Sequence, residues 1–208
     1  MSQSYTLLFQ VAGPMQSWGY RSRFDYRDTS LEPTRSGIIG LICAAMGIAR
    51  GEDISQFDSI RVGVRVDRDG RVERDYHTAL EVVKADGSGR ESVVSRRDYL
   101  ADASFTVGLQ SEDRRLLDTI AEALRNPAWI LFLGRKAFPP ATPPLRPEDG
   151  PADGTLEDHL LGGHSNKRVI LESSEGERVQ NDWPLCFAER RFRPRPIQTC
   201  FDWAGGKG

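Results

Sequence analysis

The sequence predicts an α+β protein in which a ferredoxin-like domain of the RRM type carries an inserted β-hairpin and a β-rich C-terminal extension. The order of elements is the first reason, because strand-like and helix-like segments follow one another as β-α-β, hairpin, β-α-β. Such an order is typical of an antiparallel sheet with two helices on one face. Length is the second reason, because 208 residues can bury a sizeable core in one large domain or two small ones.

The N-terminal part of the domain is predicted to contain a buried strand at residues 5–13, which a Gly-Pro pair ends. Residues 14–35 are polar, aromatic and basic, and therefore indicate a long loop. A helix is expected to start at Thr34 or Ser36, since either hydroxyl can cap it, and to end at a following glycine. Its interior is apolar on nearly every side, so we expect the helix to be buried.

The following segments alternate between strand and helix patterns. The expected elements are a strand at 59–66, a strand pair within 71–83 with a flexible tip at 84–92, a strand at 103–110, an amphipathic helix at 112–127 and a strand at 128–140 that runs into a Gly-Arg-Lys turn. Residues 1–140 are therefore assigned to the ferredoxin-like domain. Residues 141–208 form the extension, whose loop and strands are expected to pack on the same domain. Residues 139–158 are expected to be an exposed, Pro-rich and acidic loop, and residues 167–173 a strand.

Composition limits the functions that the chain can have. The formal net charge is -2, so any binding of nucleic acid must depend on local basic patches. The 3 cysteines are widely spaced, which argues against a disulfide framework and indicates the cytoplasm. The N-terminus lacks the pattern of a signal peptide, and the longest nearly apolar run, residues 38–49, is too short to cross a bilayer. We therefore expect a cytoplasmic protein that binds no membrane.

Aromatic rings and guanidinium groups alternate in the loop that follows the first strand. Tyr20, Arg21, Arg23 and Arg27 supply both the flat surfaces on which bases stack and the cations that phosphates attract. The alternative is an ordinary surface loop whose aromatic residues pack into the core, and Trp18 in particular is expected to be a core residue. The pattern makes single-stranded nucleic acid a candidate ligand of this loop.

The start of the expected helix, PTRSG at residues 33–37, is a candidate phosphate site. A helix N-terminus has free N–H groups, and Arg35 would add a charge-assisted contact. The alternative is plain helix capping, which is the usual role of such a sequence.

Three further groups of basic residues are candidates for contact with a phosphate backbone. They are Arg90, Arg96 and Arg97 on the expected hairpin, Arg135 and Lys136 after the last strand of the domain, and the run ERRFRPRP at 189–196, in which four arginines surround Phe192. The alternative for each group is a solvated charged surface, and Glu91 and Asp98 dilute the charge of the hairpin. The last run can equally face an acidic partner subunit.

His77, in the segment DYHTAL, is the candidate for a general acid or base in a nuclease, because an imidazole titrates near neutral pH. The alternative is a strand histidine with no chemistry. His159 and His164 do not have the spacing of metal ligands on a helix. The sequence has no nucleotide-binding glycine loop, GxSxG elbow, HExxH or P-loop motif, so we expect no enzymatic activity, no metal and no cofactor.

Five segments together resemble a known family. AGPMQSWG, PTRSGIIGLICAAMGI, DYHTAL, RRDYLADASFTVGL and FLGRKAFPP occur in the order found in CasD proteins, the RAMP-superfamily subunits of the type I-E CRISPR complex Cascade. The resemblance covers residues 5–140 and continues more weakly to the end. It implies a RAMP-type domain with a hairpin thumb, and a non-catalytic subunit that caps the 5′ handle of the CRISPR RNA in antiviral defence. The backbone subunit and the large subunit of the complex are the implied protein partners, and target DNA is read through the guide RNA.

The resemblance also implies an RNA-binding role for particular residues. These are Gln16, Tyr20, Arg21, Arg23, Arg27, Arg35 and Ser36 in the loop and the helix start, His77, Lys84, Arg90, Arg96 and Arg97 in the thumb at residues 77–103, and Gly134, Arg135 and Lys136 after the fourth strand. The acidic residues 147–158 are expected to face away from the RNA. Two alternatives stay open: a metal-independent endoribonuclease that processes CRISPR repeat RNA with His77, Tyr76 and Lys84, and a structural adaptor that touches only protein.

Overall fold

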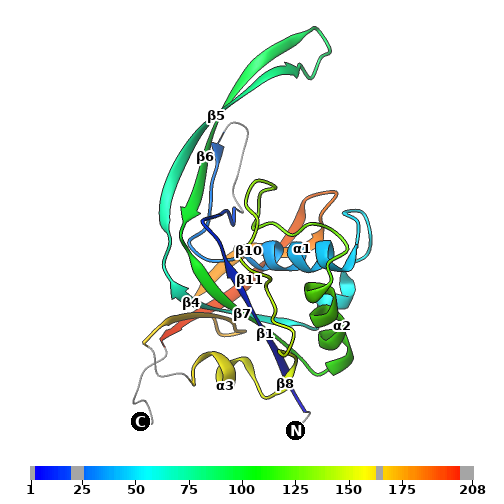
Figure 1. Cartoon of the computed structure of the whole chain (residues 1–208), viewed down its shortest axis with the longest axis vertical. Coiled ribbons are helices and arrows are strands. Elements are labelled where there is room, and N and C mark those ends of the chain that lie inside the picture. Colours follow the sequence, from blue (N-terminus) through cyan, green and yellow to red (C-terminus); the bar gives the residue numbers. More distant parts are fainter. Residues whose placement is uncertain (1–2, 20–25, 163–165, 202–208) are drawn as a thin grey trace.

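A long β-hairpin projects from a body in which helices cover a sheet (Figure 1). The computed structural model describes residues 3–19, 26–162 and 166–201. The strands within these residues are β1 (Tyr5–Ala12), β2 (Met15–Gln16), β3 (Tyr26–Arg27), β4 (Arg61–Arg68), β5 (Arg71–Val83), β6 (Arg90–Ala101), β7 (Ser104–Ser111), β8 (Ala152–Asp153), β9 (Arg168–Glu172), β10 (Arg178–Cys186) and β11 (Arg191–Phe201). The helices are α1 (Arg35–Met46), α2 (Arg114–Arg125) and α3 (Leu156–Leu160), with a 3-10 turn η1 at Ser55–Phe57. The predicted mixed α+β class with mostly antiparallel sheets is confirmed.

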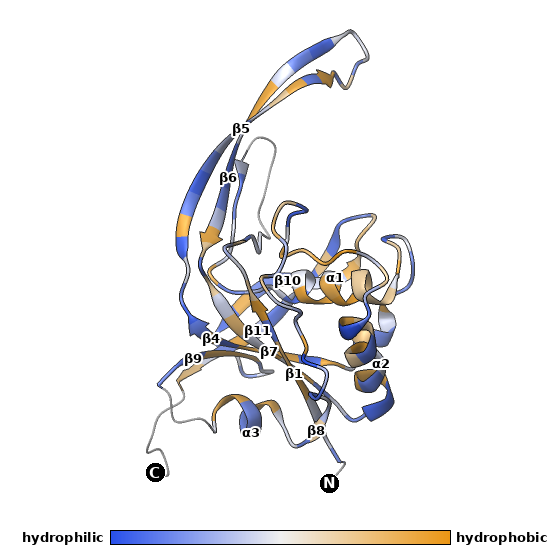
Figure 2. Ribbon diagram, in the orientation of Figure 1, coloured by the Kyte–Doolittle hydropathy of each residue, from blue (hydrophilic) through white to orange (hydrophobic). Residues whose placement is uncertain are grey.

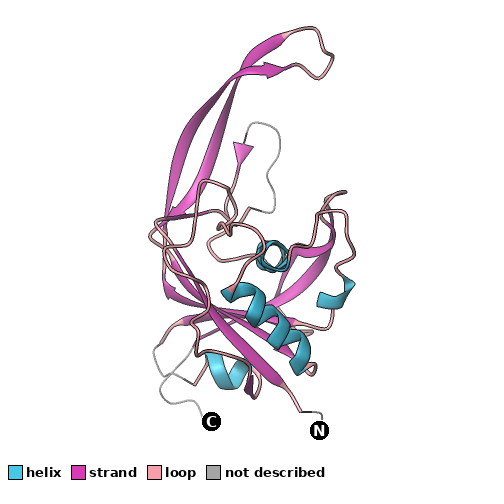
Figure 3. Cartoon of the chain, turned by 45° about the vertical axis from the view of Figure 1, so that its right-hand side comes forward, coloured by secondary structure: helices cyan, strands magenta, loops and turns pink. Residues whose placement is uncertain are grey.

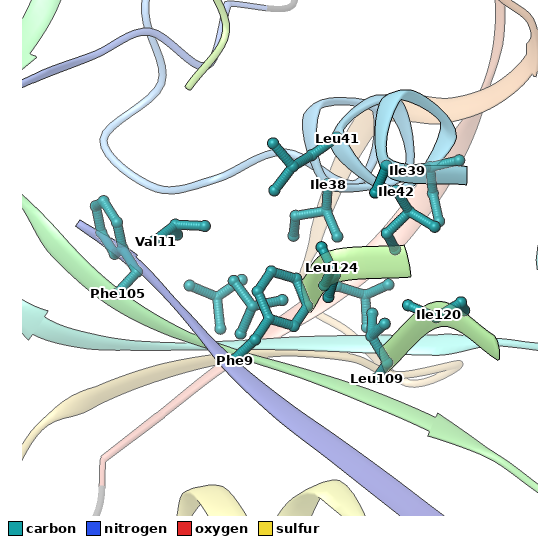
Figure 4. Close-up of a cluster of buried hydrophobic side chains, with 14 of the residues drawn as sticks. Phe9, Val11, Ile38, Ile39, Leu41, Ile42, Phe105, Leu109, Ile120 and Leu124 are labelled. Atoms are coloured by element: carbon teal, nitrogen blue, oxygen red, sulfur yellow. The ribbon is translucent and has the colours of Figure 1, made fainter. Parts of the chain in front are cut away.

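The main sheet contains seven strands in the order β10-β11-β9-β4-β7-β1-β8, and all neighbours in it pair antiparallel. The register of the central pair places Leu7 opposite Leu109 and Val11 opposite Phe105. Side chains alternate between the two faces of a strand, so these residues face the same side. All four are fully buried, and Figure 4 shows such side chains meeting those of α1 and α2 in one cluster.

Both long helices begin at a side chain that caps them, and α1 ends at a glycine. The Thr34 side chain accepts a hydrogen bond from the Gly37 N–H at the start of α1, and Gly47, with a φ of 73°, ends this helix in the left-handed region. Asp113 caps α2 in the same way by accepting a hydrogen bond from the Leu116 N–H. The two predicted helices are confirmed. Figure 2 shows hydrophobic residues along most of α1, in keeping with its burial.

The opposite face of the sheet is covered by α3 (Figure 3). Leu156 and Leu160 pack against Gly63 and Gly108, where an added Cβ would come within 2.7 and 2.6 Å of the leucine side chains. The glycines therefore let the helix lie close to β4 and β7. The prediction of an exposed loop at residues 139–158 is wrong in part, because Leu145 and Leu156 within this range are buried.

Residues 128–140 do not form the predicted strand. The backbone folds back on itself, because the Leu133 N–H donates to the Phe138 carbonyl and the Phe138 N–H donates to the Arg135 carbonyl. Leu131, Leu133 and Phe138 are buried in the main core. The apolar pattern that predicted a strand is therefore explained by the burial of a compact loop.

The projecting hairpin consists of β5 and β6, and it starts earlier than the predicted thumb. β5 is one continuous strand from Arg71 rather than a pair of strands, and Arg71 lies opposite Ala101 on β6. The pairing is irregular near Glu81, which has a φ of 59°. β2 and β3 both pair with β6, so the described segments Met15–Gln16 and Tyr26–Arg27 are attached to this strand of the hairpin.

The C-terminal strands continue the main sheet. β9 pairs with β4, and β11 and β10 follow it outward to the sheet edge. The strand predicted at residues 167–173 is confirmed as β9. Within the described part of the chain, no helix has the length and apolar character needed to cross a membrane.

Candidate functional site

A pocket of about 470 Å³ lies beside the base of the hairpin. Its walls come from the loop after β1, the start of α1, the strand β6, the turn at Gly134 and Arg135, and two phenylalanines of the C-terminal strands and their turn. These segments are far apart in the sequence. The site is therefore assembled by the tertiary fold and not by a single motif.

Three arginines from different segments line this pocket: Arg27, Arg97 and Arg135. β3 and β6 pair in parallel with Arg27 in register with Arg97, which places the two side chains on the same face. Arg135 is held by hydrogen bonds from its guanidinium to the carbonyl oxygens of Asp98, at 2.8 Å, and of Arg27, at 3.3 Å. The Arg97 guanidinium donates to the Ser95 hydroxyl at 2.9 Å. Hydrogen bonds thus hold the guanidinium groups of Arg97 and Arg135 beside the pocket, and Arg27 lines the same space.

Three arginines and one carboxylate, that of Asp28, line the pocket, so positive charge is in excess there and favours an anion. Burial lowers the pKa of Arg135, and the positive charge of Arg97 lowers it further, while Asp75 acts in the opposite direction. None of the three pocket arginines forms an ion pair with a carboxylate in the described ranges. A guanidinium presents several N–H donors in a plane, which suits a phosphate or a carboxylate. The arrangement can therefore bind a phosphate group through more than one arginine.

Gly134 is required by the close approach of two chain segments. Its φ is 89°, and an added Cβ would coincide with the space of the Ser17 carbonyl oxygen. The Ser17 N–H also donates to the Leu133 carbonyl at 3.0 Å. Gly134 lines the pocket, where its lack of a side chain permits this contact and brings Arg135 to the pocket.

Gln16 and Trp18 form part of the support beneath the pocket. The Gln16 amide donates to the Ala103 carbonyl at 2.8 Å, and its oxygen accepts from the Trp18 indole N–H at 3.1 Å. Gln16 is completely buried and Trp18 is nearly so. The side chain of Gln16 is therefore occupied inside the protein, and we correct the expectation that it contacts RNA.

The structure places the Arg35 side chain away from the pocket. It is buried, with an ion pair of 2.8 Å to Glu172 and a hydrogen bond of 2.8 Å to the Phe57 carbonyl. Its guanidinium lies 3.5 Å from the ring centroid of Trp183. The backbone N–H of Arg35 donates to Asp182 at 2.8 Å. The predicted phosphate contact of Arg35 is wrong, because the C-terminal strands already occupy both its side chain and its N–H, whereas Ser36 does line the pocket.

The remaining predicted residues do not gather at this pocket. Within the described ranges, the pocket walls contain none of His77, Lys84, Arg90, Arg96 and Lys136. The first four belong to the hairpin strands or its tip, and Lys136 is exposed beside Arg135. Tyr20, Arg21, Arg23 and His164 lie outside the described residues. No group of three or more potential metal ligands occurs within the described residues.

Sequence reasoning missed the two aromatic walls of the pocket. Phe187 and Phe192 line it from the turn between β10 and β11 and from β11 itself. The basic run around Phe192 was visible in the sequence. Its position beside the loop that follows β1 was not, because the two segments are far apart in the chain. Phe187 had no such signal, because a single phenylalanine beside a strand is most often a packing residue.

Comparisons with known proteins agree with this architecture. A family model described as "CRISPR-associated protein (Cas_Cas5)" matches residues 6–198. The chain is 36% identical over 210 residues to "CRISPR system Cascade subunit CasD" of Escherichia coli (strain K12), with 91% of this chain and 92% of that protein covered.

Two solved structures are also similar. A chain of a "CRISPR RNA-guided surveillance complex" has a TM-score of 0.82 at 34% identity and covers 94% of this chain and 89% of its own length. A "Crystal structure of Cas protein" has a TM-score of 0.76 at 37% identity and covers 98% of this chain and 100% of its own length. The fold of this chain is thus that of a CRISPR-associated protein. The chain belongs to the Cas_Cas5 family, and the resemblance expected from its sequence motifs is confirmed.

Proposed function

We propose that this chain is a subunit of a Cascade-type, CRISPR RNA-guided complex in which it binds the 5′ handle of the CRISPR RNA without cutting it. The similarity to a Cascade subunit and to a chain of a surveillance complex supports the assignment to such a complex. The observation that carries the RNA contact is the convergence of Arg27, Arg97 and Arg135 on one pocket. Phosphates of a single strand are the anions that fit this convergence within an RNA-guided complex.

The topology supports a ferredoxin-like, RAMP-type core as the scaffold of this site. β1, α1, β4, β7, α2 and β8 follow one another as β-α-β-β-α-β, and the four strands lie in the order β8-β1-β7-β4. The hairpin is inserted between β4 and β7 of this core. The short β8 would then stand in the position of the fourth strand, next to β1.

The hairpin is the proposed contact with the backbone and large subunits of the complex. Tyr76, Leu80 and Val83 are 66%, 73% and 64% exposed, which is unusual for large apolar side chains along one projecting element. Exposed apolar groups of this kind commonly mark a surface that a protein partner covers. His77 lies next to Tyr76 on the same exposed strand, and we give it no catalytic role.

The proposal is tested with Arg97→Ala and Arg135→Ala in the complex reconstituted with its guide RNA. Each variant is expected to retain the 5′ handle about tenfold less tightly, since each loses a charge-assisted contact. The slope of log K against log salt concentration should become shallower by about 0.7 for each lost phosphate contact. Arg115→Ala, on the exposed surface of α2, is the matched control and should leave both quantities unchanged. Unchanged retention and slope in both pocket variants would instead favour a structural adaptor.

A further inference from the structure

The cationic pocket continues into a second pocket of about 240 Å³. Both pockets are lined by Gly19, Arg27, Ser36, Phe187 and Phe192, so they form one groove with Arg27 in the middle. The second pocket extends the groove toward the C-terminal strands. The groove is therefore longer than the three-arginine site requires.

The extension of the groove carries its own positive charge. Arg50, from the loop after α1, and Arg190, from the turn between β10 and β11, both line it. Neither forms an ion pair with any residue of the described ranges. Since Arg97 and Arg135 line the first pocket, Arg27 has guanidinium groups on both sides along the groove. A repeated series of cations suits a ligand with repeated negative charge.

Two aromatic rings lie between these groups of cations. Phe187 and Phe192 are both partly exposed and line both pockets. Phe187 is supported from below by α1, since a Cβ on Gly40 would lie 3.8 Å from its ring. Rings that alternate with cations along a groove are the arrangement that binds single-stranded nucleic acid, with bases on the rings and phosphates on the cations. An acidic protein segment would use the cations and have less use for the exposed rings.

The C-terminal turn is held firmly against the rest of the groove. The Ala188 N–H donates to the Arg50 carbonyl at 3.0 Å, which ties the turn to the loop after α1. Asp182 of β10 accepts a hydrogen bond from the Arg35 N–H, and Trp183 stacks on the Arg35 guanidinium. The rings and Arg190 are thus presented by a supported element, as a binding surface requires.

We propose that the turn between β10 and β11, together with Arg50, forms a second half of the RNA-binding groove. Arg50 and Arg190 bind a further phosphate of the same single strand, and Phe187 and Phe192 stack against one of its bases. This inference rests on the proposed function and extends it, because it assigns to the C-terminal strands a direct part in holding the RNA.

The test is the double variant Arg50→Gln with Arg190→Asn, made in the full chain within the reconstituted complex. Asparagine is chosen because Arg190 has a φ of 52°, a conformation that asparagine tolerates. The matched control is Arg178→Gln, which removes an exposed arginine of β10 that lines neither pocket. The double variant should bind fluorescein-labelled guide RNA about tenfold less tightly, with a salt slope shallower by about 0.7, as the loss of one phosphate contact requires. The control should bind as the wild type does.

The outcomes separate this inference from the proposed function. Wild-type affinity and slope in the double variant, with Arg97→Ala still impaired, would overturn the second half of the groove and leave the handle site intact. Wild-type behaviour of both variants would overturn both proposals. A photo-crosslinking residue in place of Phe192 tests independently which molecule lies against this side of the groove. A crosslink to the guide RNA supports the inference, and a crosslink to a protein subunit instead contradicts it.

Discussion

Gly134 is the residue at which the cationic pocket tolerates a side chain least. Its left-handed backbone and its contact with the Ser17 carbonyl both exclude a Cβ. We therefore expect Gly134→Ala to lower the free energy of unfolding by about 2–3 kcal/mol, since a strained φ and a steric clash both act against the native state. Urea unfolding followed by circular dichroism measures this change.

Gly51→Ala is the matched control for that substitution. A Cβ at Gly51 meets nothing within 4 Å, and its φ lies outside the left-handed region. The free energy of unfolding should change by no more than about 0.5 kcal/mol. Equal stability of the two variants would mean that the close approach at Gly134 is not required.

The position of a residue at the pocket could be predicted where the local sequence pattern decides whether its side chain is exposed. Arg97 and Arg135 were expected at the site from the basic runs and from the family resemblance, and both line the pocket. Arg35 and Gln16 were not assigned correctly, because distant partners decide their burial. Glu172, which pairs with Arg35, follows it by 137 residues in the chain, and no local sequence signal reports such a pairing.

At the scale of elements, the base of the hairpin is held by a buried carboxylate. Asp98 of β6 accepts hydrogen bonds from the guanidinium of Arg74 on β5 and from the hydroxyl of Tyr26 on β3. Hydrogen bonding from Arg74 is the largest influence on the Asp98 carboxyl, burial opposes it, and Tyr26 adds to it, so that the pKa of Asp98 is lowered. One side chain therefore joins three strands.

This arrangement predicts a pH-dependent contribution to stability. A carboxyl with a lowered folded-state pKa stabilises the native state above its unfolded pKa, about 3.9, and loses that effect as the pH falls through the folded value. Asp98→Asn should therefore have a lower urea midpoint than the wild type at pH 7. The difference should shrink steadily below about pH 4. A difference that stays constant from pH 7 to pH 2.5 would show that the charge of Asp98 has no part in it.

Most elements were predictable because their signals are local. The caps of α1 and α2 and the alternation in β4 and β7 appear in the sequence at the positions where the elements form. The strand predicted at residues 128–140 was wrong, because an apolar segment of the same composition can be buried either as a strand or as a folded loop. The helix α3 was missed because its five residues are too few for a helical period to be seen.

At the scale of the whole molecule, a buried network of charges joins the first helix to the C-terminal strands. Arg35 and Arg195 both contact Glu172, at 2.8 and 3.3 Å, and Arg195 also pairs with Asp182 at 2.7 Å. All four side chains are buried. Removing Arg35 takes from Glu172 its shorter ion pair and leaves one arginine of the network, Arg195, to balance two buried carboxylates.

We therefore expect Arg35→Ala to lower the free energy of unfolding by about 3–5 kcal/mol. The control is Arg146→Ala, which breaks the largely exposed pair with Asp149 outside this network and should cost no more than about 1 kcal/mol. Urea unfolding of both variants gives the comparison. A stable Arg35→Ala protein whose RNA affinity has a shallower salt slope would instead restore the original assignment of Arg35 to the RNA.

The position of this network in the chain has a consequence for biosynthesis. Glu172, Asp182 and Arg195 come from strands that leave the ribosome after both long helices and the whole hairpin have been made. A nascent chain that ends before them holds Arg35 without its counter-charges and lacks the aromatic wall at Phe187 and Phe192. Premature termination upstream of β9 should therefore yield products that proteases recognise and remove before they can compete for guide RNA.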